Sequence, residues 1–377
     1  MSVPHSTAQA AFRTWIEIDL AGLRHNAAVA RQCAGEGNRV MAVVKANGYG
    51  LGAVACARAL ADHVDAFGVA TLDEAIELRS AGLERPIYIL SPLLPSEIAP
   101  AVRYGFMAAI STWHEGEAFS AAAHQTGKPA LIHFVLDTGM GRIGVLEDEA
   151  QVLATKVGQQ PGLIIDSVAS HFPSADEDEP FTLEQQKRFW LLADGMRQAG
   201  LNFRFTQIAN SCGALGYPRT APEMLRCGLM LFGLSPMKAY QPRLQQVLTW
   251  KTRVILVRGM PRGRGISYGR TFVTSRKTTV ATLAVGYADG YQRHLSGRGA
   301  EVLIRGQRCP VLGRVTMDQI MVDVTDLPPA VAGDEAILIG KDGPEEITAG
   351  ELAEKAGTIP YEILTGLGRR VARLVKT

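Results

Sequence analysis

The sequence Val40-Met41-Ala42-Val43-Val44 is a short apolar run that ends at a lysine, Lys45. Its length and its β-branched residues are typical of a strand buried on both faces of a parallel sheet. Further apolar runs alternate with longer stretches of helical periodicity, and they cover residues 66–70, 87–90, 107–110, 131–136, 163–167, 205–209 and 224–227. Eight such strands alternating with helices predict an α/β protein with a (β/α)8 barrel of the TIM type. A doubly wound open sheet is the competing architecture.

The pattern changes near Pro242, where short apolar runs begin to alternate with turns such as Arg305-Gly306-Gln307. The candidate strands are residues 248–257, 279–285, 301–304, 310–315, 320–324 and 336–339. They predict a mostly antiparallel β domain. The T-x-x-E spacing of Thr348 and Glu351 predicts the start of one helix. We therefore expect the barrel over residues 12–242 and the β domain over residues 243–377, with residues 1–11 associating with the β domain.

Composition and charge limit the classes of partner. Hydrophobic residues make up 47% of the 377 residues, charged residues make up 20%, and the formal net charge is +2. Such a composition supports a large core, and it gives no broad electrostatic field for nucleic acid or for a membrane surface. The five cysteines lie far apart, without a C-x-x-C pair, so we expect free thiols and no metal site. No signal peptide and no membrane span is expected, which favours a cytoplasmic location.

Polar and glycine-rich sequence recurs directly after the predicted strands, at the end of a barrel where active sites lie. Lys45 opens the loop Lys45-Ala46-Asn47-Gly48-Tyr49-Gly50. A lysine between apolar walls and a polar mouth has a lowered pKa, and the neutral amine can form a Schiff base. The alternative is a solvated lysine at the start of a loop.

Two further loops follow the last two predicted strands, where barrels often bind phosphate. They carry Asn210-Ser211 and Gly228-Leu229, whose hydroxyl and backbone N–H groups suit a phosphate, although they equally suit an ordinary turn. Arg226 lies inside an apolar strand and needs buried partners, which an ion pair could also provide. His171 follows the sixth strand and could be either functional or a core histidine.

In the second domain, glycines frame a tyrosine in Gly265-Ile266-Ser267-Tyr268-Gly269. A tyrosine at a strand end is the alternative interpretation. The arginines between Arg253 and Arg276 are interleaved with glycine, proline and β pattern and lack stacking aromatics, which argues against a nucleic-acid site.

These segments together resemble the alanine racemases. The lysine segment 42–52 is similar to the cofactor-lysine signature of that family, and Ser267-Tyr268-Gly269 is similar to its tyrosine turn. The resemblance continues in order along nearly the whole chain, through residues 137–144, 171–172, 210–211, 225–233, 286–290, 317–318 and 360–362. It implies a pyridoxal-phosphate barrel with a β domain, assembled as a head-to-tail homodimer in which each active site takes residues from both subunits.

The resemblance also implies a role for each matched residue. Lys45 holds the cofactor and acts as one base, and Tyr268 of the partner subunit acts as the other. Arg226 faces the pyridine nitrogen, and His171 connects Arg226 to Tyr268. The residues implied to hold the phosphate are Tyr49, Ser211, Gly228, Leu229 and Tyr361. Those implied to meet the substrate or narrow its entrance are Arg142, Met317 and Tyr287, the last two coming from the partner.

The implied reaction is the interconversion of L-alanine and D-alanine, which serves either D-alanine biosynthesis and peptidoglycan precursors or, as the alternative, catabolism. Two bases on opposite faces of a planar intermediate accomplish it. One departure from the family concerns Val135, which stands where the family usually has a carbamylated lysine that steadies the arginine equivalent to Arg142. Arg142 therefore needs another partner or a bound anion. The alternatives are a serine or broad-spectrum racemase, a pyridoxal-phosphate-dependent decarboxylase of the same architecture, and a non-catalytic carrier of the cofactor.

Overall fold

The computed structural model describes residues 12–218 and 222–376. The chain divides into two compact units, each of which we describe by itself. The barrel unit comprises Ala21–Gly48 and Ala53–Gln245. The described residues of the β unit are 12–20, Tyr49–Gly52 and 246–376, so most of the barrel unit is an insertion in the sequence of the β unit.

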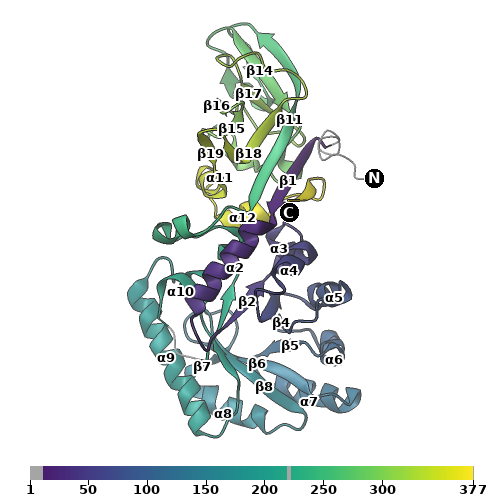
Figure 1. Ribbon diagram of the computed structural model, residues 1–377, viewed down its shortest axis with the longest axis vertical. Helices are drawn as coiled ribbons and strands as arrows, with labels where there is room; N and C mark the ends of the chain where they lie inside the picture. Colours follow the sequence, from purple (N-terminus) through teal and green to yellow (C-terminus); the bar gives the residue numbers. More distant parts are fainter. Residues whose placement is uncertain (1–11, 219–221, 377) are drawn as a thin grey trace. The chain divides into compact units, whose positions relative to one another are not determined.

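The barrel unit is built on parallel strands that follow one another around a nearly closed sheet (Figure 1). In the order of the sheet they are β10 (Met224–Cys227), β2 (Arg39–Val43), β3 (Ala66–Val69), β4 (Ile87–Ile89), β5 (Met107–Ile110), β6 (Ala130–Asp137), β8 (Leu163–Ala169) and β9 (Phe205–Gln207). An isolated parallel bridge between Thr206 and Glu223 brings the two ends of the sheet together. The eight apolar runs of the sequence correspond to these eight strands, and the predicted (β/α)8 barrel is confirmed.

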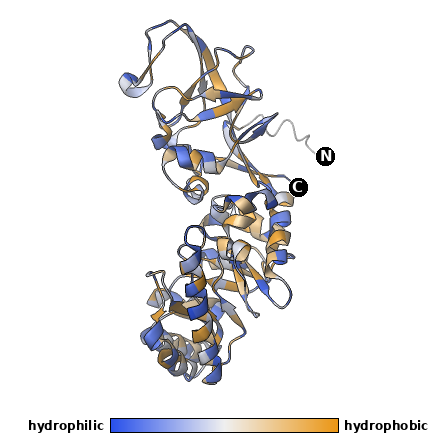
Figure 2. Cartoon of the chain, turned by 90° about the vertical axis from the view of Figure 1, so that its left-hand side faces the viewer, coloured by the Kyte–Doolittle hydropathy of each residue, from blue (hydrophilic) through white to orange (hydrophobic). Residues whose placement is uncertain are grey.

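Helices cover the outside of the barrel. They are α2 (Leu20–Ala34), α4 (Ala53–Leu60), α5 (Leu72–Ser80), α6 (Pro95–Tyr104), α7 (Trp113–Thr126), α8 (Glu147–Gly158), α9 (Glu179–Gln198) and the short α10 (Ser211–Gly216), and a two-residue strand, β7 (Val145–Leu146), pairs with β6. Their starts follow from capping chemistry: Thr112 accepts a hydrogen bond from the N–H of Glu115, whose carboxylate in turn accepts from the N–H of Thr112. In Figure 2 hydrophobic colour follows the strands, and the helices carry hydrophilic residues on their outer faces.

A buried polar contact ties β4 and β8 of the barrel to Arg204, the residue that precedes β9. Asp166 on β8 is 2% exposed, and it accepts hydrogen bonds from the Tyr88 hydroxyl on β4 and from Arg204 Nε at 2.7 Å. A buried carboxylate is tolerated only when it is paired and hydrogen-bonded, and these two donors satisfy that requirement. Burial, followed by the charge of Asp166, raises the pKa of Tyr88, so this phenol remains a donor.

The β unit contains a mostly antiparallel sheet. Its main path runs through β16 (Gln307–Pro310), β15 (Glu301–Ile304), β18 (Glu335–Asp342), β11 (Leu248–Met260), β1 (Thr14–Asp19) and β20 (Ala372–Lys376). Side branches are formed by β14 (Thr278–Leu283), β17 (Ile320–Asp323) and β19 (Glu345–Ile347), and β12 (Gly265–Ile266) pairs separately with β13 (Phe272–Val273). Two helices, α11 (Ala349–Ala356) and α12 (Pro360–Thr365), precede β20. The predicted antiparallel β domain is confirmed, apart from the parallel pairing of β1 with β20.

The first strand differs from the expected domain limits. We expected the barrel to begin at residue 12, but Thr14–Asp19 lies in the sheet of the β unit, antiparallel to β11 and parallel to β20. Trp15, Ile16 and Ile18 are fully buried there, and their burial accounts for the placement of the strand. The expected association of residues 1–11 with the β domain lies outside the described residues.

One strand of the β unit also differs from the sequence pattern. We expected a strand over residues 310–315, whereas the strand is β16, over Gln307–Pro310. The predicted turn begins two residues after Leu303: Arg305 and Gly306 both have positive φ, at 52° and 75°, which closes a tight hairpin between β15 and β16. Gly313, with φ at 71°, interrupts the apolar sequence that follows.

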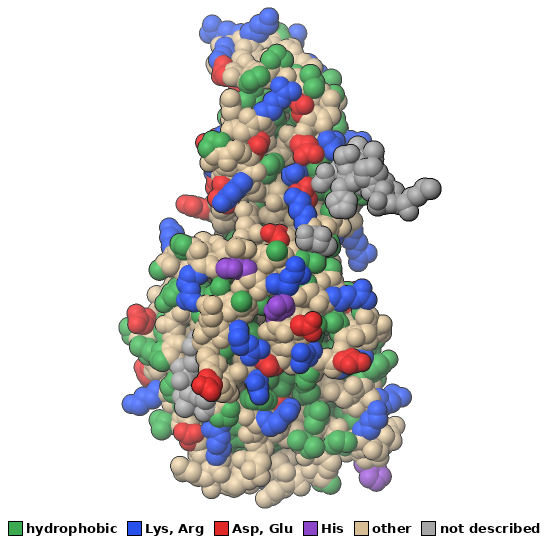
Figure 3. Space-filling view, in the orientation of Figure 1, with side chains coloured by type: hydrophobic (Ala, Val, Ile, Leu, Met, Phe, Trp, Pro, Cys, Tyr) green, Lys and Arg blue, Asp and Glu red, His purple; other side chains and the backbone are tan. Residues whose placement is uncertain are grey.

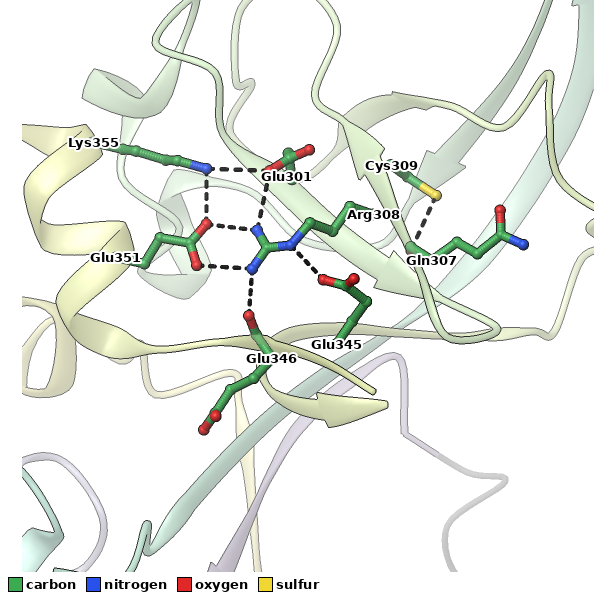
Figure 4. Close-up of polar contacts among 8 residues, drawn as sticks. All are labelled: Glu301, Gln307, Arg308, Cys309, Glu345, Glu346, Glu351 and Lys355. Atoms are coloured by element: carbon green, nitrogen blue, oxygen red, sulfur yellow. Dashed lines mark hydrogen bonds and ion pairs between the residues drawn. The ribbon is translucent and has the colours of Figure 1, made fainter. Parts of the chain in front are cut away.

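A cluster of ion pairs holds α11 to the strands of the β unit (Figure 4). Arg308 on β16 contacts Glu301 at 3.0 Å, Glu345 at 2.8 Å and Glu351 at 2.8 Å, and Lys355 contacts Glu351 at 2.8 Å. Thr348 caps α11 by accepting from the N–H of Glu351 at 3.0 Å, as the sequence predicted. The carboxylate of Glu351 is directed to Arg308, so the two residues of the T-x-x-E motif connect the helix start with the sheet.

Cationic and anionic side chains are interspersed over the face shown in Figure 3, in keeping with the small net charge. Within residues 12–218 and 222–376, no helix has the length and apolar character needed to cross a bilayer. The same residues contain no group of three or more His, Cys, Asp or Glu side chains placed to hold a metal ion. The described cysteines are all free thiols.

Candidate active site

Lys45 begins an unusual left-handed turn directly after β2. The segment Lys45–Tyr49, labelled α3, has φ/ψ of 52°/50° at Ala46, 55°/46° at Asn47 and 61°/47° at Gly48. A left-handed conformation costs a residue with a β-carbon about 1–2 kcal/mol, and such strain persists only where the surroundings hold it. Gly48 is required for a second reason, because a β-carbon there would lie 3.1 Å from the backbone of Ala53.

Three hydrogen bonds hold this turn in place within the barrel unit. The N–H of Gly48 donates to the carbonyl of Val44 at 2.8 Å, and the N–H of Ala53 donates to the Asn47 side chain at 3.1 Å. Glu74 on α5 accepts from the N–H of Ala46 at 2.6 Å. The backbone that carries Lys45 is therefore fixed by neighbours on both sides, as positioning of a reactive amine requires.

The Lys45 amine lies among other cations. Burial lowers its pKa, and the charges of Arg142 and Arg226 lower it further, while Glu74 opposes the shift. Both effects favour the neutral, nucleophilic form of the amine. The structure thus brings Lys45, Arg142 and Arg226 close enough to couple electrostatically at one end of the barrel.

Arg226 is buried, with 7% of its surface exposed, and it is satisfied by neutral acceptors. Its guanidinium donates to the carbonyls of Gln207 and Ser170, both at 2.5 Å, and to Nδ1 of His171 at 3.0 Å. Burial lowers the pKa of Arg226 to about 10, against the opposing charge of Glu223. Arg226 therefore keeps its proton at neutral pH, and its positive charge is only partly compensated nearby.

Arg142 lies in a loop shaped by one carboxylate. Asp137, the last residue of β6, accepts from the backbone N–H groups of Gly139, Met140 and Gly141 through Oδ1 at 2.9, 2.9 and 3.1 Å. This turn fixes the backbone at the end of β6, and Arg142 follows it directly in the chain. A buried link attaches the loop to its neighbour after β8, since Thr138 and Ser170 share a hydrogen bond of 2.7 Å between their hydroxyls.

Val135 packs in a small apolar cluster with Ala109 and Ala169, and the partly buried Ile143 lies against it. Its side chain is 7% exposed. No carbamate can form on this side chain, and Ile143, the residue that follows Arg142, packs against the cluster that contains it.

Ser211 lies at the first turn of α10, next to the loop that follows β10. Its hydroxyl oxygen accepts from the N–H of Gly228 at 3.0 Å and from the N–H of Met230 at 3.3 Å. With both acceptor positions engaged, the hydroxyl proton is available to donate to an anion. The structure therefore brings together Ser211, Gly228 and Leu229, the barrel residues that the sequence assigned to a phosphate.

In the β unit, Tyr268 projects from a strained turn and is 72% exposed. Ser267 before it and Arg270 after it have φ of 63° and 49°. The hydroxyl of Ser267 donates to the carbonyl of Arg314 at 2.6 Å, and a β-carbon at Gly269 would lie 3.0 Å from the Arg314 guanidinium. The turn therefore packs against the backbone and side chain of Arg314, and the Tyr268 phenol is exposed rather than packed in the core.

Tyr287 and Met317 lie on two adjoining turns of the β unit, and they are 41% and 52% exposed. The N–H of Tyr287 donates to the carbonyl of Thr316 at 3.0 Å, and the N–H of Ala288 donates to that of Met317 at 3.0 Å. Arg370 spans both turns, with contacts to Asp289 at 3.1 Å and to Asp318 at 2.7 Å. The structure therefore holds these two residues in a fixed relation to each other.

Tyr49 and Tyr361 also come together within the β unit. Their ring centroids lie 6.1 Å apart and the rings are tilted by 39°. Tyr361 is on α12, more than 300 residues along the chain from Tyr49. This pairing agrees with the common phosphate role that the resemblance implies for the two phenols.

Three residues that shape the site were missed in the sequence. Glu74 holds the lysine turn, Asp137 folds the Arg142 loop, and Gln185 on α9 donates to Thr138 at 3.0 Å and to the carbonyl of His171 at 2.9 Å. Asp137 alone had a signal, because an aspartate before glycines often binds backbone N–H groups. Nothing in the local sequence distinguishes Glu74 or Gln185 from other polar helix residues.

The chain has a parallel barrel and a separate β unit, and a lysine and two arginines interact electrostatically at the barrel mouth. This combination defines a class of two-domain barrel enzymes. Comparison with known proteins identifies the family. The family model described as "Alanine racemase, N-terminal domain" matches residues 18–236, and "Alanine racemase, C-terminal domain" matches residues 247–375.

Relatives that match almost end to end agree with these models. The chain is 40% identical to an alanine racemase of Halothermothrix orenii, over 96% of this chain and 97% of that one. It is 42% identical to an alanine racemase of Symbiobacterium thermophilum, over 96% of each. The crystal structure of an alanine racemase from Streptomyces lavendulae superposes with a TM-score of 0.91 at 35% identity, covering 97% of both chains. The chain belongs to the alanine racemase family, and it is an enzyme of the isomerase class.

Proposed function

We propose that this protein is a pyridoxal-phosphate-dependent racemase that interconverts L-alanine and D-alanine with two bases, Lys45 and Tyr268 of the partner subunit. The observation that carries the proposal is the Lys45 amine, which is held on a strained turn at a barrel mouth and has a pKa lowered by burial and by Arg142 and Arg226. A bacterial relative from Bacillus anthracis, 32% identical with a TM-score of 0.90, has been solved with bound L-Ala-P.

The residues at the barrel mouth fit pyridoxal phosphate. Burial and the charge of Arg142 lower the pKa of Lys45 toward the neutral amine that an aldehyde requires, and the Ser211 hydroxyl, with the backbone of Gly228 and Leu229, suits a phosphate. Tyr49 and Tyr361 would add two phenols to the phosphate site. When it is bound, the cofactor supplies an electron sink for the charge that develops at the substrate α-carbon.

Arg226 would face the pyridine nitrogen. Its pKa of about 10 keeps the guanidinium protonated at neutral pH, so it cannot act as a proton donor that fully charges the ring nitrogen. His171 accepts a hydrogen bond from Arg226 and would in turn hydrogen-bond to the partner's Tyr268, which would link this phenol to the cation. A nearby cationic network favours the phenolate form of a tyrosine, which otherwise has a pKa of about 10.

The proton is moved by the two bases alone. Lys45 Nζ removes or delivers the α-proton on one face of the substrate, and Oη of the partner's Tyr268 does so on the other face. Neither group has to move far, because each works on its own side. The 72% exposure of Tyr268 within its own chain supports a role in another subunit, since a phenol in such a turn has no enclosed site of its own.

Arg142 would bind the substrate carboxylate, together with the backbone of the partner's Met317, and the partner's Tyr287 with Tyr361 would narrow the entrance. Small amino acids fit this assignment, with serine or a broader range as the alternative substrates. We expect a head-to-tail homodimer in the cytoplasm.

The first test is direct. The purified protein, loaded with pyridoxal phosphate, is incubated with L-alanine, and the product is analysed on a chiral column. Formation of D-alanine supports the proposal, loss of CO₂ would indicate a decarboxylase, and a bound cofactor without turnover would indicate a carrier.

The second test addresses the two bases. Tyr268→Phe should impair proton removal from L-alanine far more than from D-alanine, as followed by exchange of the α-proton for deuterium. Equal losses of α-proton exchange from L-alanine and from D-alanine would contradict opposed bases. Mixing Lys45→Ala and Tyr268→Ala subunits should restore some activity, and its absence in confirmed heterodimers would contradict a shared site.

A further inference from the structure

Arg373 on β20 gathers the backbone of two segments that lie far apart in the sequence. Its Nε and Nη2 donate to the carbonyl of Gly50 at 3.1 and 3.0 Å. Its Nη1 donates to the carbonyls of Gly368 at 2.9 Å and Val371 at 2.7 Å, and Nη2 also donates to that of Leu367 at 3.1 Å. One guanidinium thus joins the residue after Tyr49 to the segment that follows α12.

The two segments are in direct contact at the same place. A β-carbon on Gly50 would lie 2.2 Å from the carbonyl oxygen of Leu364 on α12, so the backbone of Gly50 lies flat against that helix. Tyr49 precedes Gly50 in the chain, and Tyr361 lies one helical turn before Leu364, with the two rings 6.1 Å apart. Arg373 therefore contacts the residue that follows Tyr49 and the segment that follows α12, the helix that carries Tyr361.

We propose that Arg373 is a positioning residue that fixes Tyr49 relative to Tyr361 and so determines how tightly the enzyme binds the phosphate group of its cofactor. The inference rests on the proposed function, in which these phenols hold that phosphate. Arg373 itself makes no contact with the cofactor in this proposal and acts only through the backbone of Gly50 and of the residues after α12.

The left-handed turn explains why such an anchor is needed. Ala46, Asn47, Gly48 and Tyr49 all have positive φ between 52° and 61°, so this stretch relaxes unless contacts at both ends hold it. Glu74 holds the end near Lys45, and Arg373 holds the end at Gly50. Arginine suits the position because its planar fork carries enough N–H donors to reach the carbonyls of Gly50, Gly368, Val371 and Leu367 at once, whereas lysine and glutamine have fewer donors than there are carbonyls.

The test compares pyridoxal phosphate with pyridoxal, which lacks the phosphate, as ligands of the full-length apoenzyme. Dissociation constants are measured from the visible absorbance band of the bound ligand for the wild type and for Arg373→Gln. Losing charge-assisted hydrogen bonds of this kind should weaken binding of pyridoxal phosphate about tenfold, and binding of pyridoxal less than about twofold. A general loosening of the fold would weaken both ligands equally and leave their ratio unchanged.

Two further variants make the result decisive if Arg373→Gln fails to fold. Arg373→Lys keeps the charge but loses the fork, and Gly50→Ala forces the loop away from Leu364 while leaving Arg373 in place. Both should reduce the preference for the phosphorylated ligand. Arg276→Gln, which removes an exposed ion pair with Asp326, is the matched control and should keep the wild-type ratio.

A folded variant of Arg373 that keeps the wild-type ratio of the two dissociation constants would overturn the inference. The outcome is separable from that of the proposed function. A wild type that binds neither ligand, or binds both equally, contradicts the proposed phosphate site. If the wild type prefers pyridoxal phosphate and Arg373→Gln keeps the same ratio of dissociation constants, only the role of Arg373 is contradicted.

Discussion

Nη2 of Arg226 lies 3.0 Å from Nδ1 of His171. A guanidinium can only donate, so Nδ1 is the acceptor and the imidazole carries its proton on Nε2. Burial, and then the charges of Arg226, Arg142 and Lys45, lower the pKa of His171 to about 3. His171 is therefore a neutral ring at physiological pH, with one fixed tautomer and one N–H left to donate.

Stability should fall as the pH falls below the ordinary pKa of histidine. The unfolded chain takes up a proton near pH 6.5, but folded His171 does so only near pH 3, so the unfolded state binds more protons between these values. At pH 5 this difference should cost about 2 kcal/mol relative to pH 7.5. His133, whose pKa burial lowers to about 4, should contribute similarly.

The measurement is urea denaturation of the apoenzyme at both pH values. His171→Gln should lose less stability between pH 7.5 and pH 5 than the wild type does. His114→Gln, which changes an exposed histidine on α7, is the control and should show the wild-type difference. An identical pH dependence in His171→Gln would contradict a ring that stays neutral down to about pH 3.

Arg142→Gln should change both the substrate affinity and the acid–base behaviour of Lys45. Removing the charge of Arg142 should raise the pKa of Lys45, because that charge lowers it in the native site. Losing the partner of a carboxylate should raise KM for alanine by roughly thirty-fold or more. The first effect is measured from the pH dependence of cofactor uptake by the apoenzyme, and the second from initial rates.

Arg142→Lys separates these two effects. It keeps the positive charge, so the pKa of Lys45 should stay low, but it loses the two-pronged contact with a carboxylate, so KM should still rise. If Arg142→Gln left both quantities unchanged, Arg142 would lie outside the site.

Asp166→Ala should strongly destabilise the barrel unit. The substitution leaves the Tyr88 hydroxyl and the Arg204 guanidinium without their shared acceptor. Arg204 is 63% exposed and can be solvated, but leaving the buried Tyr88 hydroxyl without a partner costs about 1–3 kcal/mol, which urea denaturation would detect. Asp326→Asn, at an exposed ion pair with Arg276, should show no measurable change, and an equally small effect for Asp166→Ala would argue against the contact.

Arg370→Gln should raise KM for alanine more than it lowers kcat. Arg370 ties Asp289 to Asp318, and these residues end the turns that carry Tyr287 and Met317. Loosening the two turns should raise KM about three- to tenfold, since a small displacement of positioning groups weakens binding. Arg197→Gln, which removes the exposed ion pair with Asp194 on α9, serves as the control. A change in kcat alone would show that the turns do not contact the substrate.

The strands and the local motifs were predictable because their signals are local. Continuous apolar runs gave the barrel strands, and the spacing of Thr348 and Glu351 gave the start of α11. The left-handed turn at Ala46 and Asn47 was not predictable, because neither residue prefers that conformation enough to signal it. Arg370 and Arg373 had no signal at all, since their distant partners, Asp318, Asp289 and Gly50, lie 52 to 323 residues away and only the folded chain brings them together.

The placement of β1 has a consequence for how the protein is made. Thr14–Asp19 lies between β11 and β20, whose residues are synthesised more than 220 positions later. During translation this apolar strand leaves the ribosome early and must wait, without its neighbours, while the whole barrel is produced. A truncated chain that starts at residue 247 would leave a gap between β11 and the edge strand β20, so a separately expressed β domain should require residues 12–20 supplied as a fused or added peptide in order to fold.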